Sequence, residues 1–266
     1  MTVARVREIE MAYDDVGSGP VVVLLHGYPF NRSMWREQAQ ALESAHYRVI
    51  TPDLRGHGET TVTTEPATME EMARDVVALL DELDIERVTL GGLSMGGYVA
   101  LAFYRRFPLR ARALILADTR PQADTPEAAR NREEQAQKIL KEGIGSIADD
   151  FLKKVLTPET LQQKPETVER VREMILKTDP RGAANALRGM AMRHDQSAFL
   201  EEFFAPTLLI VGSEDQLTPP KDAELMRREI RGSRLSIIEG ASHLSNLERP
   251  IEFNRAVLDF LDALQP

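Results

Sequence analysis

Residues 87–107 read RVTLGGLSMGGYVALAFYRRF, and this stretch decides the fold. Its first residues form a short apolar run that is typical of a buried strand, and residues 95–107 are expected to form a helix. The Gly-x-Ser-x-Gly motif at residues 92–96 therefore lies where a strand turns sharply into a helix. Such a turn presents a serine hydroxyl at the positive end of the helix, which favours developing negative charge. We interpret Ser94 as a nucleophile; the alternative is a glycine-rich turn with an incidental serine.

Strands and helices alternate along most of the chain. Residues 21–25 are continuously aliphatic, as in a parallel strand that is buried on both faces. Residues 3–13 are expected to form edge strands, with a hairpin that closes near residues 17–20. The other predicted elements are strands at residues 47–52, 87–93, 113–117, 207–211 and 234–238 and helices at residues 33–44, 69–83, 221–230 and 250–264. This order predicts an α/β fold with a mostly parallel central sheet and flanking helices.

Residues 121–204 differ from the rest of the chain. They are highly charged and prone to form helices, and they contain no convincing strand. A helical block of this size between two buried strands is typical of an insertion that covers one end of the sheet. We therefore expect an α/β core made of residues 1–120 and 205–266 and an inserted helical cap, or lid, at residues 121–204.

A serine hydroxyl is a poor nucleophile near neutral pH and needs a general base. The chain has five histidines, and His243 lies in a loop between a predicted strand and the last predicted helix. We therefore assign the role of base to His243. His26 and His57 lie beside glycines in turns, where we expect them to hold loops by hydrogen bonds. His46 lies in a helix–strand connection and His194 in the predicted cap.

The imidazole also needs a carboxylate that fixes its tautomer. Asp215 and Asp118 each follow a predicted strand, and either would give the chain order Ser, Asp, His. We favour Asp215, because the Gly-x-x-Asp turn at residues 212–215 gives it a loop of its own. Glu214, one residue earlier, is a weaker third candidate.

Acyl transfer needs two backbone N–H donors for the oxyanion. The amide of Met95, directly after Ser94, is expected to be one of them. The other is expected from the loop after the strand at residues 21–25, where the sequence reads His-Gly-Tyr-Pro. Tyr28 is our candidate there, since Pro29 has no N–H. Taken alone, this segment would also fit a simple turn.

Composition and charge limit the class of protein. The 266 residues are 42% hydrophobic, which suffices for a substantial core, and the formal net charge of −9 disfavours a nucleic-acid partner. No cysteine is present, which excludes disulfides, thiolate metal sites and a cysteine nucleophile. The chain has no phosphate-loop, dinucleotide or His-Glu-x-x-His motif, so we expect neither a cofactor nor a metal. A charged N-terminal stretch and the lack of a long apolar run predict no membrane partner and a cytoplasmic location.

Five segments occur along the chain in an order that is typical of one known family. They are His-Gly-Tyr-Pro at residues 26–29, Asp-Leu-Arg-Gly-His-Gly at 53–58, Gly-Leu-Ser-Met-Gly-Gly at 92–97, Gly-Ser-Glu-Asp at 212–215 and Gly-Ala-Ser-His at 240–243. On these segments the chain resembles the α/β-hydrolase superfamily, and most of all small carboxylesterases, 3-oxoadipate enol-lactonases and cofactor-free haloperoxidases or perhydrolases.

The resemblance implies particular roles for the residues of these segments. Ser94, Asp215 and His243 would form a catalytic triad, and the amides of Tyr28 and Met95 would hold the oxyanion. The helical cap would form the pocket for the acyl or alcohol group. Serine rather than aspartate at position 94 departs from the pattern of haloalkane dehalogenases and epoxide hydrolases, which argues against those activities.

We therefore expect a serine hydrolase that cleaves small carboxylic esters or lactones through an acyl-enzyme on Ser94. One alternative is a perhydrolase, in which hydrogen peroxide replaces the deacylating water, because Pro29 beside the oxyanion donor resembles the haloperoxidase pattern. Another is a ligand-binding signalling protein on the same scaffold. A dicarboxylate lactone would need an arginine that faces the pocket, and the candidates in the predicted cap are Arg130, Arg132, Arg188 and Arg193.

Overall fold

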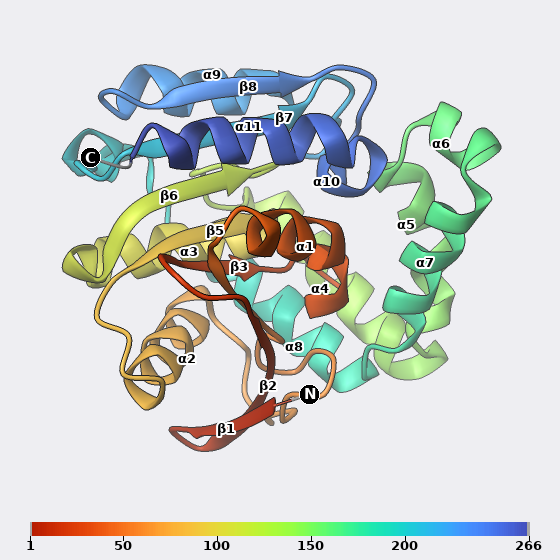
Figure 1. The fold of residues 1–266 in the computed structure, drawn as a ribbon. Helices are drawn as coiled ribbons and strands as arrows, with labels where there is room; N and C mark the ends of the chain where they lie inside the picture. Colours follow the sequence, from red (N-terminus) through yellow and green to blue (C-terminus); the bar gives the residue numbers. More distant parts are fainter. Residues whose placement is uncertain (1, 265–266) are drawn as a thin grey trace.

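Eight strands form one sheet through the middle of the molecule (Figure 1). The computed structural model describes residues 2–264, so Met1 and residues 265–266 of the predicted core lie outside the described part. The strands are β1 (Thr2–Val6), β2 (Ile9–Val16), β3 (Val21–Leu25), β4 (Arg48–Pro52), β5 (Val88–Leu93), β6 (Ala111–Ala117), β7 (Thr207–Gly212) and β8 (Arg234–Ile238). Their order across the sheet is β1-β2-β4-β3-β5-β6-β7-β8. All neighbours from β4 to β8 are parallel, whereas β1 and β2 are antiparallel, which confirms the predicted α/β fold.

The N-terminal hairpin closes at a different place from the predicted one. Val6 pairs with Ile9, so the turn consists of Arg7 and Glu8 rather than residues 17–20. Arg7 has φ 52°, and two-residue hairpin turns need positive φ because that backbone twist matches the twist of the strands. Residues 17–20 instead connect β2 to β3. The prediction was wrong because glycines and a proline mark many kinds of tight connection besides a hairpin.

Helices cover both faces of the sheet (Figure 1). On one face lie α1 (Arg36–Ser44) and α11 (Pro250–Asp262), and on the other lie α2 (Met69–Glu82), α3 (Met95–Arg106) and α9 (Pro220–Glu229). These helices start and end close to the predicted positions. In α2 the apolar side chains recur at helical spacing and are buried against the rest of the core. Among residues 2–264, no helix has both the length and the apolar character that a membrane span needs.

Five further helices lie between β6 and β7. They are α4 (Pro126–Glu142), α5 (Ala148–Val155), α6 (Pro158–Gln163), α7 (Pro165–Leu176) and α8 (Pro180–Ala191). Four of them begin with a proline, which suits a first turn because the N–H that it lacks would have no partner there. Figure 1 shows these helices in green and teal at the end of the sheet toward which the parallel strands point. Ligands of open α/β sheets bind at that end.

A buried carboxylate ties this helical block to the loop that carries His243. Glu248 ends the short helix α10 (Ser245–Glu248) and has no exposed surface. One of its oxygens accepts hydrogen bonds from the N–H and the hydroxyl of Thr157, each at 2.8 Å, and the other accepts from the N–H of Ser242 at 2.6 Å. Thr157 immediately precedes α6 and Ser242 immediately precedes His243, so this carboxylate connects the two segments.

Candidate active site

Ser94 sits on the sharp turn between β5 and α3. Its backbone has φ 54° and ψ −114°, a strained conformation for a residue other than glycine, which persists only where the surrounding structure holds it. A Cβ atom on Gly92 would collide with the backbone of Gly96, and one on Gly96 would collide with the carbonyl of Leu25. Strand and helix can approach this closely only because both positions are glycine.

His243 and Asp215 form a buried hydrogen-bonded pair. His243 Nδ1 lies 2.8 Å from Asp215 Oδ2, and each residue is 3% exposed. The Thr218 hydroxyl donates to the same carboxylate oxygen at 2.7 Å, and the N–H groups of Leu217 and Thr218 donate to the other. The proton of the imidazole is therefore on Nδ1, and Nε2 is left as an acceptor. This is the tautomer that a general base needs.

Burial and charge act in opposite directions on this pair. Burial favours the neutral form of each group, but the attraction between imidazolium and carboxylate and the hydrogen bond between them outweigh it. The pKa of His243 is raised above its ordinary value, and the pKa of Asp215 is held below its own. Near neutral pH the carboxylate is therefore ionised and orients the imidazole.

Asp118, the competing acid, has other hydrogen-bond partners. It follows β6 with φ 44° and is fully buried. One carboxylate oxygen accepts from the Gly212 N–H at 2.8 Å, and the other accepts from the Ser245 hydroxyl. Burial, and then the negative charge of Asp215, raise the pKa of Asp118 well above its ordinary value. Asp118 thus joins the end of β6 to β7 and α10. The third candidate for the acid, Glu214, is exposed.

Two backbone N–H groups near Ser94 have no hydrogen-bond partner among residues 2–264. They belong to Tyr28, in the loop after β3, and to Met95, the first residue of α3. The loop lies against the serine, because a Cβ atom built on Gly27 would be 3.5 Å from the Ser94 Cβ. Unpaired donors beside a hydroxyl are what a developing oxyanion requires.

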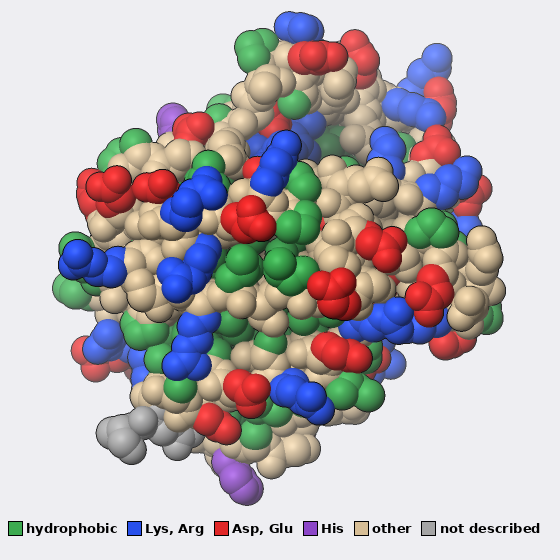
Figure 2. Space-filling view, turned by 90° about the horizontal axis from the view of Figure 1, so that it is seen from above, with side chains coloured by type: hydrophobic (Ala, Val, Ile, Leu, Met, Phe, Trp, Pro, Cys, Tyr) green, Lys and Arg blue, Asp and Glu red, His purple; other side chains and the backbone are tan. Residues whose placement is uncertain are grey.

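Ser94 and His243 both line one cavity of about 190 Å³. Within the described residues no hydrogen bond joins the serine hydroxyl to the imidazole, and such bonds are often long until a substrate binds. Figure 2 shows a hollow in the surface seen from above, with Lys and Arg side chains around it. The cavity lining combines apolar or aromatic side chains with cations; examples are Tyr98, Phe151 and Leu187 and, among the cations, Arg120, Arg132 and Lys154.

The other histidines have different surroundings. His26 Nε2 accepts a hydrogen bond from the Leu54 N–H at 2.9 Å, and its Nδ1 donates to a neighbouring carbonyl, so it holds two loops together as predicted. Burial lowers the pKa of His26 to about 4 and that of His57 to about 3, so both are neutral. His46 and His194 are exposed. Across residues 2–264, no three His, Cys, Asp or Glu side chains gather closely enough to hold a metal ion.

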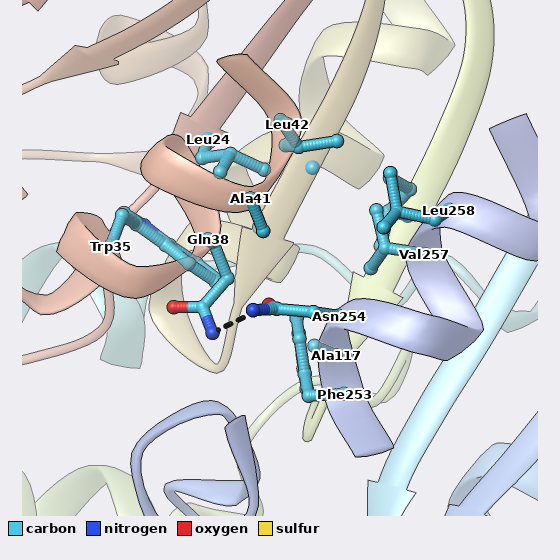
Figure 3. A pocket seen from close by; sticks show the side chains of 13 residues that line it. Leu24, Trp35, Gln38, Ala41, Leu42, Ala117, Phe253, Asn254, Val257 and Leu258 are labelled. Carbon is cyan, nitrogen blue, oxygen red and sulfur yellow. Dashed lines mark hydrogen bonds between the residues drawn. The ribbon is translucent and has the colours of Figure 1, made fainter. Parts of the chain in front are cut away.

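A second, smaller cavity lies in the core between the sheet and the helices α1 and α11 (Figure 3). Its volume of about 10 Å³ is room for roughly one water molecule. Apolar side chains form most of its wall, and the Gln38 amide donates to Asn254 Oδ1 at 2.9 Å beside it. This cavity is too small for a substrate and is a packing gap.

Several residues of the site were not predicted from the sequence. The hydroxyl of Thr218 donates a hydrogen bond to Asp215. The Asp-x-x-Thr spacing could have indicated this contact, because polar groups two or three residues after an aspartate often bond to its side chain. Arg120 and Lys154 line the cavity, and nothing in the pattern of charges distinguishes them from solvated residues.

The four arginines proposed for a dicarboxylate substrate have four different environments. Arg132 lines the cavity. Arg193 is buried behind it, with its guanidinium 4.3 Å from the ring centre of Tyr98. Arg188 pairs with Glu133 at 2.8 Å, and Arg130 is exposed.

Comparisons with known proteins agree with this fold. Residues 20–250 match a family model described as alpha/beta hydrolase fold. The 3-oxoadipate enol-lactonase 2 of Acinetobacter baylyi is 30% identical over 253 residues, which are 94% of this chain and 92% of the relative. The non-heme chloroperoxidase CPO-A1 of Kitasatospora aureofaciens is 28% identical, with 96% of each chain covered. A solved thermophilic esterase from Thermogutta terrifontis, with malate bound, is 40% identical, has a TM-score of 0.97 and covers 100% of both chains.

Proposed function

The chain belongs to the alpha/beta hydrolase family, and on this basis we propose that it is a serine hydrolase that cleaves small carboxylic esters or lactones through an acyl-enzyme on Ser94. The observation that carries the proposal is the bond between His243 and Asp215 at the cavity that Ser94 also lines. These three residues would supply the nucleophile, the base and the orienting acid of a catalytic triad.

In the first half of the reaction, Nε2 of His243 takes the proton of the Ser94 hydroxyl while Oγ attacks the carbonyl carbon. The resulting oxyanion accepts hydrogen bonds from the N–H groups of Tyr28 and Met95. His243 then gives its proton to the leaving oxygen as the carbon–oxygen bond breaks, and the acyl group stays on Ser94. With a lactone, the leaving oxygen remains attached to the acyl chain as a hydroxyl.

In the second half, water removes the acyl group. Nε2 of His243 takes a proton from the water while its oxygen attacks the acyl carbon, and the same two N–H groups hold the second oxyanion. When this intermediate collapses, the bond to Ser94 Oγ breaks, His243 returns the proton to Oγ, and the carboxylic acid leaves. The atoms balance with substrate and water alone.

We assign residues 121–204 the role of a cap over an α/β core made of residues 1–120 and 205–266. Side chains from α4, α5 and α8 contribute to the wall of the cavity. Its volume of about 190 Å³ lies below the roughly 300–1,000 Å³ of common ligand pockets. A cavity of this size favours short acyl groups and small lactones.

The rate of ester hydrolysis should rise with pH. His243 acts as a base only when neutral; burial disfavours its imidazolium form, but the attraction of Asp215 outweighs this and raises the pKa of His243. We therefore expect kcat/KM to increase through one ionisation with a midpoint above the ordinary histidine value of about 6.5. Initial rates with p-nitrophenyl acetate across the acid and neutral range measure this midpoint. A profile that falls with pH in this range contradicts the assigned base.

Esters of graded acyl length test the proposed function. The kcat/KM for p-nitrophenyl acetate and butyrate should exceed that for the palmitate at least about tenfold, because the cavity cannot enclose a long chain. A fluorophosphonate probe should label Ser94 in the same preparation. A preference for palmitate would contradict the picture of a small cavity. A protein that turns over no ester or lactone would favour the ligand-binding alternative.

Perhydrolysis is the second candidate function, because this chain is similar to a non-heme chloroperoxidase over nearly the whole length of both proteins. In this reaction hydrogen peroxide replaces water in the second half, and the acyl-enzyme yields a peracid instead of an acid. The measurement is peracid formed from an acetate ester and hydrogen peroxide, compared with acetate released under the same conditions.

A further inference from the structure

Cationic side chains gather at the cavity. Arg120, Arg132 and Lys154 line it. Among residues 2–264, no aspartate or glutamate lines this cavity. The whole protein has a formal net charge of −9, so this local excess runs against the overall charge. A cleft lined by one sign of charge raises the local concentration of ions of the opposite sign.

Three guanidinium groups share one buried carboxylate at the edge of the cavity. The side chain of Asp124 is 0% exposed; Arg193 Nη1 lies 2.8 Å from its Oδ1, and Arg120 Nη2 lies 3.7 Å from the same oxygen. Arg132 bonds to both oxygens of this carboxylate. Three positive charges and one negative charge leave a formal excess of two. Asp124 therefore fixes these cations in place without neutralising them.

Several donors at this cavity lack a good acceptor within residues 2–264. Nε of Arg120 and the hydroxyl of Tyr28 are buried with no hydrogen-bond partner, and both residues line the cavity. Lys154 is exposed and forms no ion pair among residues 2–264, and Nη1 of Arg132 meets the thioether of Met190 at 3.5 Å, a weak acceptor. Buried donors without acceptors are costly. A ligand that brings acceptor oxygens into the cavity would give Arg132 and Lys154 the strong acceptors that they lack there.

We propose that the substrate carries a free carboxylate besides its ester or lactone group, and that Arg120, Arg132 and Lys154 form the subsite that binds it. This inference rests on the proposed hydrolase function and names the substrate class. Guanidinium and ammonium groups form short, charge-assisted hydrogen bonds with carboxylates. The cavity of about 190 Å³ must also hold the reacting carbonyl. A monoester of a short dicarboxylic acid, or a small lactone with a carboxylate side chain, meets both conditions.

The two ends of such a substrate would meet different parts of the chain. Ser94 and His243 belong to the turn after β5 and the loop after β8, whereas Arg132 lies on α4 and Lys154 on α5. Arg120 follows β6, in the connection that leads to α4. The ester group would therefore face the sheet, and the carboxylate would lie between Arg120 and the helical block. Apolar side chains of the lining, such as that of Phe151, suit a short methylene chain between them.

Two matched esters test the subsite. Monomethyl glutarate carries a carboxylate, and methyl glutaramate replaces it with an uncharged amide of nearly the same size. We expect the wild-type kcat/KM for the acid to exceed that for the amide by about tenfold or more, the usual size of a lost hydrogen bond to a charged group. Lys154→Met and Arg132→Met should each lower this ratio about tenfold.

Lys153→Met and Arg130→Met are the matched controls. Lys153 precedes Lys154 on α5, and Arg130 lies on α4 near Arg132; both are exposed and neither lines the cavity. Both control variants should leave the ratio unchanged. A wild-type ratio near one, or a preference that survives both Arg132→Met and Lys154→Met, would overturn the subsite.

Binding of glutarate separates a wrong subsite from a wrong function. In calorimetry, glutarate should bind to the wild type, glutaramide should not, and Arg132→Met and Lys154→Met should weaken the binding. If the wild type cleaves neither ester but binds glutarate through these residues, the subsite is right and the hydrolase function is wrong. If it cleaves both esters equally and glutarate does not bind, the function is right and the subsite is wrong. If it neither cleaves nor binds, both are wrong.

Discussion

Replacing Ser94 by alanine is expected to lower kcat for ester hydrolysis by about a millionfold, to near the uncatalysed background. Alanine removes Oγ, the atom that would accept the acyl group, and leaves the bond between His243 and Asp215 intact. The positive φ at this position is no worse for alanine than for serine, so the fold should persist. Initial rates with p-nitrophenyl acetate measure the loss, on protein whose circular dichroism matches that of the wild type.

Ser18→Ala is the matched control for this variant. Ser18 lies exposed in the connection between β2 and β3 and does not line the cavity. It should leave both the rate and the labelling by a fluorophosphonate unchanged, whereas Ser94→Ala should lose both. If Ser94→Ala keeps more than a few per cent of the wild-type kcat, another group is the nucleophile.

The strand, turn and helix at residues 87–107 could be predicted because their signals are local. An apolar run, glycines on either side of a serine and a following helical pattern lie within one short stretch, and each constrains the others. The same motif accounts for the strained backbone at Ser94, since side chains at positions 92 and 96 would collide with nearby backbone and prevent the sharp turn. The N-terminal hairpin lacked such support, because a turn of Arg7 and Glu8 contains no glycine, asparagine or proline.

The choice between the two aspartates could not be decided from chain order. Asp118 and Asp215 follow β6 and β7, which are neighbours in the sheet, so both carboxylates come to the same edge. What separates them is the direction of the loop after β7, which brings the carboxylate of Asp215 to His243 Nδ1. That direction depends on two contacts. The bond between Asp215 and Thr218 is set by the geometry of the turn, and the contact with His243 in the loop after β8 joins residues that are distant in sequence.

The sequence offered Arg132 as one of four arginines that could face the cavity, but it did not select Arg132 among them and did not indicate Arg120 or Lys154. Helical periodicity indicates which apolar positions are buried, but an inward arginine interrupts that pattern and is taken for a solvated one. Arg132 can face inward because Asp124, eight residues earlier and before α4, accepts hydrogen bonds from its guanidinium. The partner lies outside the helix, so helical spacing does not point to it.

Asp215→Asn is expected to lower kcat by about 10⁴, the cost of the corresponding change in a serine-protease triad. Oδ1 of Asp215 accepts from the backbone N–H groups of Leu217 and Thr218, which cannot reverse their role. The asparagine oxygen must therefore stay there, and its NH₂ takes the place of Oδ2 and faces His243 Nδ1. This forces the imidazole proton onto Nε2, which can then no longer take the proton of Ser94. The loss of the negative charge should also lower the pKa of His243, so the pH midpoint of the residual activity should fall below that of the wild type.

Asp118→Asn is the matched comparison, and its effect on kcat should stay within about tenfold. The asparagine oxygen can still accept from the Gly212 N–H, and the Ser245 hydroxyl can turn its hydrogen away and accept from the new NH₂. Burial and the charge of Asp215 raise the pKa of Asp118 well above its ordinary value, so an uncharged amide resembles the protonated acid that this site favours. Measured side by side with p-nitrophenyl acetate, the two variants should differ by about a thousandfold in kcat. If Asp118→Asn is the crippling change and Asp215→Asn is not, Asp118 is the orienting acid, and the bond between His243 and Asp215 serves only to hold the loop.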